Sequence, residues 1–363
     1  MKTVAVFFGG KSNEHEISVI TGMYCVNLLR GGEWKILPVY LPQEGGMLLA
    51  DADGVEEFRK TESGRFLPVL LEGRQLTRIK RHKPLCVIDC ALNCCHGGAG
   101  EDGTLSALLR WNKIPSASPD AAVSAVFMNK TYSKIAARGL GIPVAPSFTV
   151  GEWEEDFLSR ADEAGYPLIV KPACLGSSIG IRVAENGEEL GRALELAFTL
   201  DHSALVEKYF PHKRDVNCAA YRKGGEIVVS ACEEVFSDEK ILTFAEKYEG
   251  AGERNSRLPA DLPEEVSEKI RRYTRLIYET FGVRGVVRAD FLVVDGEVYF
   301  NELNTVPGSL ATYLFGERLS DARDFLCNLV REGLGAREGE KRTVTTGILD
   351  RGVFSGGKSC KRR

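Results

Sequence analysis

Two apolar runs, residues 286–294 and 298–303, constrain the fold more than any other feature of the chain. They flank the dipeptide Asp295-Gly296, and an Asp-Gly pair between such runs is a strong signal for a β-hairpin. The runs are too short for helices of a globular core and are rich in β-branched residues. The sequence therefore predicts two adjacent antiparallel strands in this region.

The length of the turn decides whether the polar side chains of the two strands meet. Side chains alternate between the faces of a strand, so Arg288 and Asp290 share one face, and Glu302 and Asn304 share one face. A two-residue turn would place Asp290 and Glu302 on opposite faces. A three-residue turn over 294–296, with the glycine in the left-handed conformation, places them on the same face. We predict the three-residue turn.

Such a hairpin would gather two carboxylates, an amide oxygen and a guanidinium on one face. Hard oxygen ligands suit Mg²⁺, which usually takes one or two carboxylates together with substrate phosphates. The alternative is a solvated outer face, but the strongly apolar remainder of both strands argues against it. The hairpin therefore predicts a site for Mg²⁺, or Mn²⁺ in its place, at Asp290, Glu302 and Asn304.

A second candidate site follows an apolar strand that ends in Lys171. The next residues form a loop of small side chains, Gly176-Ser177-Ser178, with Gly180 shortly after it. Small residues let backbone N–H groups approach phosphate oxygens, and a lysine supplies a compact positive charge beside them. A plain hairpin loop is the alternative. The combination favours a phosphate-binding loop.

Two glycine-rich turns follow strands nearer the N-terminus. In the turn over residues 8–16, Glu14 and Glu16 could favour the start of a helix or hold a substrate ammonium group. In the turn over 94–103, a cysteine nucleophile beside His96 is conceivable, although neighbours in sequence rarely have the geometry for that pairing. A turn that lines a small-molecule pocket is favoured. Both turns lie at the carboxyl ends of predicted parallel strands, where ligands bind.

The order of elements predicts an α/β domain with a parallel sheet, followed by two α+β lobes. Residues 43–84 lack a clear pattern and are expected to form loops and edge elements. Expected strands are 3–8, 36–41, 86–91, 168–171, 179–183, 204–207, 216–221 and 226–232, and expected helices are 16–30, 103–111, 121–139, 188–198 and 263–281.

The predicted domains cover residues 1–118, 119–206 and 207–342, and the tail 343–363 lacks a core pattern and is expected to be disordered. The span 237–262 shows little periodicity. Long loops inside compact domains are usually functional, so we expect it to form a lid over the site.

The bulk properties exclude several classes of protein. A net charge of −4 gives no basic surface for nucleic acid. No stretch approaches the roughly 20 apolar residues of a membrane span. The ten cysteines follow no CxxC pattern, and no export signal is visible, so we expect reduced thiols in the cytoplasm.

Together these stretches resemble the D-alanine–D-alanine ligase family of the ATP-grasp fold. The resemblance runs from about residue 2 to about residue 335. It is carried, in order, by FFGGKSNEHEIS, CCHGGAGEDGTLSALL, FMNKTYSK, GIPVAP, LIVKPACLGSSIG, EKYF, AEKY and VRADF with NELNTVPGS. It implies a cytoplasmic homodimer that uses ATP and Mg²⁺ to join two D-alanine molecules for peptidoglycan synthesis. It also implies a substrate-binding first domain, a central ATP-grasp lobe and a C-terminal lobe with the metal site.

The resemblance further implies roles for individual residues. Those of the nucleotide site are Lys130, Lys171 and Ser178 at the phosphates, Glu207, Lys208 and Phe210 around the adenine, Asp215 near the ribose, and Asn301 beside the metal ligands. Those of the amino-acid sites are Glu14 at the first ammonium, His96 near its carboxylate, Ser177 and Tyr248 linked to Glu14, Lys247 near the phosphate or second substrate, Arg288 and the N–H of Gly308 at the oxyanion, and Ser309 at the second substrate.

One residue departs from the pattern of that family. Tyr313 falls where the family commonly has a serine that grips the carboxylate of the second amino acid. A phenol can still donate one hydrogen bond. Tyr248 favours D-alanine as the second substrate, because relatives that make depsipeptides replace it. The alternatives are a ligase for D-serine, D-lactate or another amino acid, and an ATP-binding protein without catalysis.

Overall fold

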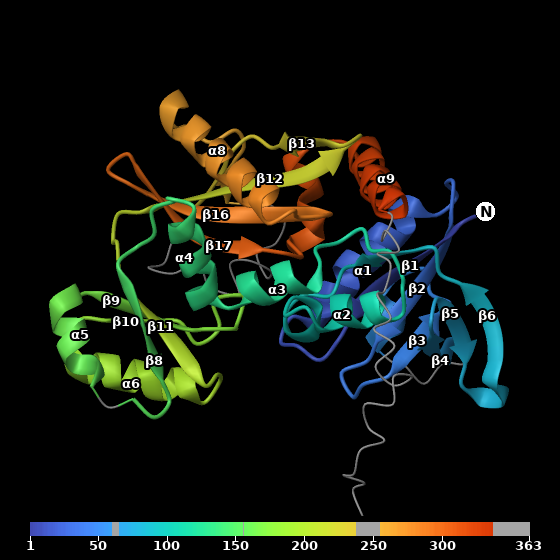
Figure 1. The fold of residues 1–363 in the computed structure, drawn as a ribbon, viewed down its shortest axis with the longest axis horizontal. Coiled ribbons are helices and arrows are strands. Elements are labelled where there is room, and N and C mark those ends of the chain that lie inside the picture. Colours follow the sequence, from blue (N-terminus) through green and yellow to red (C-terminus); the bar gives the residue numbers. More distant parts are fainter. Residues whose placement is uncertain (60–64, 155, 237–254, 337–363) are drawn as a thin grey trace, which may run out of the picture.

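The computed structural model describes residues 1–59, 65–154, 156–236 and 255–336. The predicted site residues Lys247 and Tyr248, most of the predicted lid and the predicted disordered tail lie outside the described residues. The described part contains three β-sheets with helices packed on them (Figure 1).

The first sheet has seven strands in the order β6-β5-β4-β3-β2-β1-β7. Strand β1 (Thr3–Gly9), next to the edge strand β7, is buried throughout and pairs in parallel with β2 (Lys35–Leu41) and β7 (Cys90–Asn93). Helix α1 (His15–Leu29) packs on these strands. The parallel sheet predicted for this region is confirmed for these three strands only.

The other four strands of this sheet form an antiparallel meander where loops and edge elements were predicted. They are short and only partly buried, so their alternation is weak in the sequence. Their bounds are β3 (Met47–Ala50), β4 (Phe66–Glu72), β5 (Gln75–Arg78) and β6 (Lys83–Val87), with the 3₁₀ helices η1 (Val55–Arg59) and η2 (Lys80–His82).

The predicted strand 86–91 is divided between β6 and β7 at Asp89. The Asp89 carboxylate accepts the backbone N–H of Thr3 at 2.8 Å and a hydrogen bond from Arg74 at 3.0 Å. These bonds tie the break to the start of β1. The chain then continues through η3 (Gly98–Gly100) and α2 (Thr104–Trp111).

The predicted helix 121–139 is two helices, α3 (Ala121–Met128) and α4 (Lys130–Gly139). Asn129 between them has an extended backbone, and its side chain accepts the N–H of Tyr132 at 3.1 Å. Asparagine is a favoured N-cap, so it starts a new helix where an apolar pattern alone predicts continuation.

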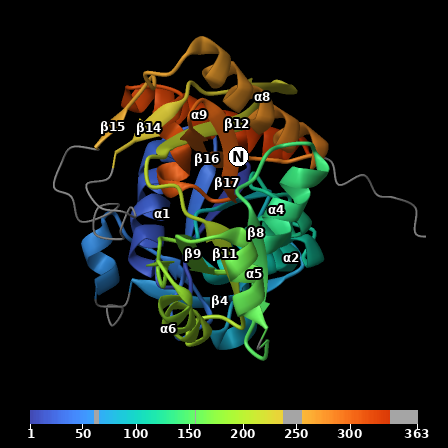
Figure 2. The same cartoon turned by 90° about the vertical axis from the view of Figure 1, so that its left-hand side faces the viewer.

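The second sheet has four antiparallel strands in the order β10-β9-β11-β8. Helices α5 (Phe157–Ala164) and α6 (Gly187–Phe198) cover it with a small core of their own (Figures 1 and 2). Its strands are β8 (Ser147–Gly151), β9 (Leu168–Pro172), β10 (Arg182–Ala184) and β11 (Ser203–Lys208).

The third sheet has six strands, in the order β15-β14-β12-β16-β17 with β13 beside β12. Helix α8 (Glu264–Thr280) buries Ile270 and Ile277 against one face and leaves the other face toward the second sheet (Figures 1 and 2). The strands are β12 (Arg214–Lys223), β13 (Glu226–Val229), β14 (Glu233–Val235), β15 (Ser256–Arg257), β16 (Val286–Val294) and β17 (Glu297–Asn304).

The last described elements return to the first sheet. The 3₁₀ segment η4 (Gly308–Leu314) contacts α1, and α9 (Leu319–Gly335) contacts α1, β7 and β12. One apolar cluster thus joins both ends of the described chain (Figure 1). Within the described residues, no helix has the length and apolar character needed to span a bilayer. The predicted domain boundaries stay predictions.

Candidate active site

The hairpin that carries the predicted metal ligands has a two-residue turn. Asp295 and Gly296 both have left-handed backbones, with φ of 49° and 82°, and Val294 pairs directly with Glu297. The three-residue turn was therefore wrong. An Asp-Gly pair suits the left-handed geometry of a tight turn, which continues the twist of the flanking strands.

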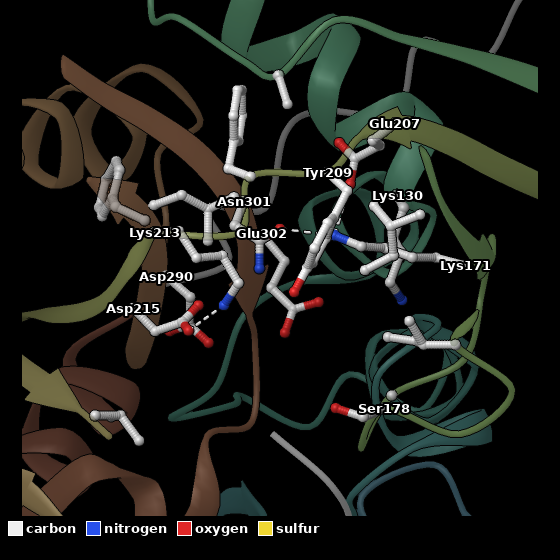
Figure 3. A pocket seen from close by; sticks show the side chains of 18 of the residues that line it. Lys130, Lys171, Ser178, Glu207, Tyr209, Lys213, Asp215, Asp290, Asn301 and Glu302 are labelled. Atoms are coloured by element: carbon white, nitrogen blue, oxygen red, sulfur yellow. Dashed lines mark hydrogen bonds and ion pairs between the residues drawn. The ribbon is translucent and has the colours of Figure 1, made fainter. Parts of the chain in front are cut away.

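Asp290 and Glu302 nevertheless face each other, as predicted, for a different reason. Phe291 pairs with Phe300, but Asp290 pairs with Glu302, so Asn301 is an extra residue in β17. Such a bulge shifts the register by one position. The bulge brings both carboxylates to one face, and it also turns Asn301 toward the cavity (Figure 3).

Arg288 and Asn304 lie in the next row of the same face, directly opposite each other. Arg288 donates two hydrogen bonds to the Asp290 carboxylate, both at 2.8 Å, and the Asn304 amide donates a third at 3.0 Å. Burial by itself would lower the pKa of Arg288. The charge of the Asp290 carboxylate and its hydrogen bonds have the larger effect, so the pKa of Arg288 is raised. The guanidinium thus stays charged beside the carboxylates.

A cavity with about 990 Å³ of empty space, partly open to solvent, lies between the second and third sheets (Figure 3). It brings together most predicted nucleotide and metal residues. The predicted residues that line it are Lys130, Lys171, Ser177, Ser178, Glu207, Lys208, Phe210, Asp215, Arg288, Asp290, Asn301 and Glu302.

Glu207 on β11 lies between two lysines at the base of this cavity. Its carboxylate is 2.6 Å from the amine of Lys171 and 2.7 Å from the amine of Lys134, and it is almost fully buried. Burial works against the charged form, yet the two lysines lower the pKa of Glu207 to about 2. The amine of Lys171 also donates to Asn301 at 3.0 Å. This ion-paired cluster fixes the amine of Lys171 at the cavity wall.

Lys134 is part of this cluster but was not predicted. It is 2% exposed and donates to the carbonyl of Phe300 at 3.0 Å, so it links α4 to β11 and β17. A signal was present, because Lys134 follows Lys130 by one helical turn and therefore lies on the same face of α4. Lys213 was also missed, and it lines the cavity and forms an ion pair with Asp215 (Figure 3).

The remaining nucleotide residues have other contacts in the structure. The amine of Lys130 donates to the carbonyl of Leu175, next to the small-residue loop. The amine of Lys208 donates to the carbonyls of Gly165 and Tyr166, both at 3.0 Å. Phe210 stacks on Tyr299, with ring centroids 5.3 Å apart.

The small-residue loop after β9 joins this cavity to the N-terminal turn. Ser177 and Ser178 have left-handed backbones, with φ of 51° and 59°. The Ser177 hydroxyl donates to the Glu14 carboxylate. A Cβ atom at Gly176 or at Gly97 would lie 2.9 Å from an oxygen of Glu14. Gly97 and Gly176 therefore enclose the Glu14 carboxylate so closely that a Cβ atom at either position would displace it.

His96 is buried near Glu14, and its Nε2 atom lies 2.8 Å from the hydroxyl of Thr21. The same hydroxyl accepts the N–H of Ser309 at 3.4 Å. Burial lowers the pKa of His96, and it raises the pKa of Cys95 to about 12. A thiolate nucleophile at Cys95 is therefore disfavoured, in agreement with the small-molecule pocket predicted for this turn.

Glu101 connects this turn to the segment that leads to Gly308. Its carboxylate accepts the N–H of Gly97 at 2.9 Å and the N–H of Val306 at 3.2 Å. Burial and then the charge of Glu14 raise the pKa of Glu101 to about 8. Glu101 was not predicted as a site residue, although it lies in one of the stretches that carry the resemblance.

Gly308 begins η4, in which Ser309, Leu310 and Ala311 have left-handed backbones with φ of 49° to 52°. Consecutive left-handed residues other than glycine are costly and need support from their surroundings. Here Leu310 and Ala311 are buried in the cluster under α1. Tyr313 follows, and its hydroxyl donates to Glu233 at 3.2 Å.

The site also offers ligands for a metal ion. Asp290, Glu302 and Asn304 bring two carboxylates and an amide oxygen onto one face of two paired strands. In the described residues no three His, Cys, Asp or Glu side chains gather into a metal-binding group. Two carboxylates with phosphate oxygens are what Mg²⁺ prefers, so the donor set fits that ion.

Comparisons with known proteins agree over most of the chain. Family models described as the D-ala D-ala ligase N-terminus and C-terminus match residues 3–119 and 136–322. The D-alanine–D-alanine ligases of Thermosipho melanesiensis and Wolinella succinogenes are 30% and 33% identical, over 96% and 91% of this chain and 98% and 94% of theirs.

Solved structures give the same result. The D-alanine–D-alanine ligase of Helicobacter pylori superposes with a TM-score of 0.75 at 27% identity, over 92% of this chain and 98% of that one. The VanG D-Ala:D-Ser ligase of Enterococcus faecalis superposes with a TM-score of 0.76 at 26% identity, over the same shares of the two chains.

Proposed function

The chain belongs to the D-alanine–D-alanine ligase family, which has the ATP-grasp fold, and we propose that it joins two D-alanine molecules into D-alanyl-D-alanine. The reaction would convert ATP to ADP and phosphate and would supply peptidoglycan synthesis. One observation carries the proposal. The facing carboxylates of Asp290 and Glu302 share a cavity with the amines of Lys130 and Lys171, and this cavity adjoins the enclosed Glu14 carboxylate.

In the first step, a carboxylate oxygen of the first D-alanine attacks the γ-phosphorus of ATP, and ADP leaves. The product is an acylphosphate. Lys130 and Lys171 lie where they can neutralise negative charge on the transferring group. Glu14 can hold the ammonium group of this D-alanine, and Ser177 fixes the carboxylate of Glu14 in place.

Asp290, Glu302 and Asn304 would hold Mg²⁺. When bound, Mg²⁺ neutralises phosphate charge and orients the phosphate oxygens. Arg288 lies beside these residues, and its guanidinium donates two hydrogen bonds to the Asp290 carboxylate.

In the second step, the amine of the second D-alanine attacks the acyl carbon and phosphate leaves. Arg288 and the N–H of Gly308 would stabilise the oxyanion that forms. Preorganised donors of this kind contribute on the order of 10²–10³ in rate each. The acylphosphate hydrolyses in water, so closure of the site during the reaction is required. The cytoplasmic location, the homodimer and the lid role of 237–262 stay predictions.

The test is release of ADP and phosphate by the purified protein with ATP, Mg²⁺ and each member of a panel of D- and L-amino acids and D-lactate. D-Alanine alone should support turnover, and D-alanyl-D-alanine should be the product. A product formed only when D-serine or D-lactate is added would identify a ligase with another second substrate, as in the D-Ala:D-Ser structural relative. No release with any compound would indicate an ATP-binding protein without catalysis.

A further inference from the structure

A buried acid that the mechanism above does not use lies beside Arg288. Glu233 on β14 is 2% exposed. It pairs with Asn217 on β12, Asn217 pairs with Asp290 on β16, and Asp290 pairs with Glu302 on β17. Residues directly opposite each other in a sheet share one face. Glu233 therefore extends the row of catalytic carboxylates across four strands.

Two donors hold the Glu233 carboxylate in a fixed position. The hydroxyl of Tyr313 donates to Oε2 at 3.2 Å, and the amide of Asn217 lies 3.3 Å from the same oxygen. Tyr313 stands on η4, whose buried neighbours Leu310 and Leu314 anchor it. A tyrosine hydroxyl has a single proton to donate, and here Glu233 accepts it. The phenol therefore orients the carboxylate, and donating to a substrate carboxylate would require breaking this bond.

The position of Glu233 relative to the other subsites indicates what it faces. Asp290 and Glu302, on one side of Arg288, line the nucleotide cavity. Glu14 and His96 lie in the proposed subsite of the first amino acid. Glu233 is close enough to Arg288 for its charge to act on the guanidinium. Tyr313 also acts on Arg288 through its charge, and it stands on the same 3₁₀ segment as Gly308. Glu233 and Tyr313 therefore lie near the two proposed oxyanion donors, where the acceptor amine would attack the acyl carbon.

We propose that Glu233, oriented by Tyr313, selects the second substrate by attracting an ammonium group, so that an amino acid is preferred over the hydroxy acid of the same shape. The inference rests on the proposed ligase function. A carboxylate forms a charge-assisted hydrogen bond with an ammonium group, and a neutral hydroxyl lacks that charge. Specificity is the difference between these two affinities. Glu233 thus acts on the choice of acceptor, and Arg288 acts on the oxyanion.

The experiment compares D-alanine and D-lactate as acceptors for the full-length protein, with D-alanine as the donor and at one fixed pH near neutrality. The variant Glu233→Gln keeps the shape and the hydrogen bonds to Tyr313 and Asn217 but removes the charge. We expect the ratio of kcat/KM for D-alanine to that for D-lactate to fall about tenfold, the effect of one hydrogen bond to a charged group. The KM for ATP should change less than about twofold.

Two further variants separate selection from stability. Tyr313→Phe removes the donor that orients Glu233 and should lower the same ratio by a smaller factor, even if Glu233→Gln fails to fold. Glu234→Gln is the matched control, because Glu234 is the next residue of β14 and pairs with Arg214 at 2.6 Å. Glu234→Gln should leave the ratio unchanged, although it removes an ion pair.

Four outcomes decide between these possibilities. A lowered ratio in Glu233→Gln and Tyr313→Phe, with an unchanged ratio in Glu234→Gln, supports the inference. An unchanged ratio in both test variants with normal KM for ATP overturns it, and so does a wild type that prefers D-lactate. A wild type that releases no ADP with D-alanine refutes the ligase function itself, which is a separate result.

Discussion

The nucleotide side and the amino-acid side of the site each hold a carboxyl group, and the surroundings of the two groups are opposite. Glu207 lies between Lys134 and Lys171, which lower its pKa to about 2 against the effect of burial. Glu101 accepts hydrogen bonds from the backbone N–H groups of Gly97 and Val306, and burial with the charge of Glu14 raises its pKa to about 8. Both groups belong to one continuous site.

This difference indicates how each side is stabilised. On the nucleotide side the protein supplies its own counter-charges, so the lysines are in position before ATP binds. On the amino-acid side Glu14 and Glu101 lie close enough for one charge to disfavour the other. A ligand with an ammonium group would relieve that repulsion. Substitutions should therefore affect mainly catalysis where the sides meet, mainly stability on the nucleotide side, and mainly pH dependence on the amino-acid side.

The largest effect is expected where the two sides meet, at the paired carboxylates. The double variant Asp290→Asn with Glu302→Gln keeps the shape of both side chains and removes both charges. Because Mg²⁺ needs charged oxygen ligands, we expect the variant to lose magnesium-dependent turnover altogether. Initial rates of ADP formation across a magnesium titration measure this. Glu297→Gln, at the exposed start of β17, is the control and should behave as wild type. A retained magnesium response in the double variant would rule out the site.

A smaller loss of turnover is expected from Arg288→Ala. Removing the guanidinium takes away one oxyanion donor, so kcat should fall by roughly 10²–10³. The nucleotide lysines are untouched, so the affinity for ATP should remain. Isothermal titration with ATP and steady-state kinetics separate the two quantities. Arg284→Ala, an exposed position four residues earlier, is the control. Unchanged kcat in Arg288→Ala would refute the role of Arg288.

On the nucleotide side the comparison predicts a loss of stability. Lys134→Met removes one of the two lysines paired with Glu207 and leaves its pair with Lys171, in a site that is almost fully buried. Breaking half of such a cluster should lower the free energy of unfolding by about 2–3 kcal/mol. Urea unfolding measures it, with Lys269→Met as the control. Lys269 pairs with the exposed Glu297, and such surface pairs contribute about 1 kcal/mol or less.

Measuring the stability difference between wild type and Lys134→Met at several pH values tests whether the ion pair with Glu207 causes that difference. The folded pKa of Glu207 lies below the ordinary value of 4.5. Its contribution to stability is therefore fully present above pH 4.5 and is lost as the pH falls toward 2. The stability gap between wild type and Lys134→Met should narrow over that window. A gap that stays constant with pH would mean that packing, and not the ion pair, is what Lys134 contributes.

The sequence predicted those parts of the fold in which one strong periodicity decides the structure. The buried strand β1 and the hairpin of β16 and β17 are examples, since their apolar runs leave few alternatives. The meander β3–β6 was missed because its short strands are only partly buried. The division of helix 121–139 depended on one capping side chain, Asn129, which competes with an apolar pattern that continues past it.

The site was also only partly predictable from the sequence. Asp290 and Glu302 were expected on one face, and they are, but through a bulge at Asn301 that no local pattern announces. The lysines around Glu207 come from α4 and β9, which are distant in sequence. Contacts between segments that far apart set both pKa values, because the lysines lower that of Glu207 and burial raises that of Glu101. Residue types and spacing can name such groups, but only the packing gives the sign of the shift.

On the amino-acid side, the expected effect of Glu101→Gln is a change in the pH dependence of stability. The folded pKa of about 8 lies above the ordinary value of 4.5, so the folded state holds a proton that the unfolded state releases between these values. Stability should therefore be highest below pH 4.5 and fall as the pH rises toward 8. Glutamine cannot ionise, so Glu101→Gln should remove a slope of about 1 kcal/mol per pH unit.

Unfolding free energies of wild type and Glu101→Gln from pH 5 to pH 9 measure that slope. Glutamine keeps one acceptor oxygen for the N–H groups of Gly97 and Val306, so any lost hydrogen bond adds an offset that does not vary with pH. Asp102→Asn, at the exposed neighbouring residue, should keep the wild-type slope. If Glu101→Gln also kept it, Glu101 would be ionised in the folded protein like Glu207. The contrast between the two sides would then reduce to the lysines alone, and the amino-acid side would not need a cationic ligand to balance its charge.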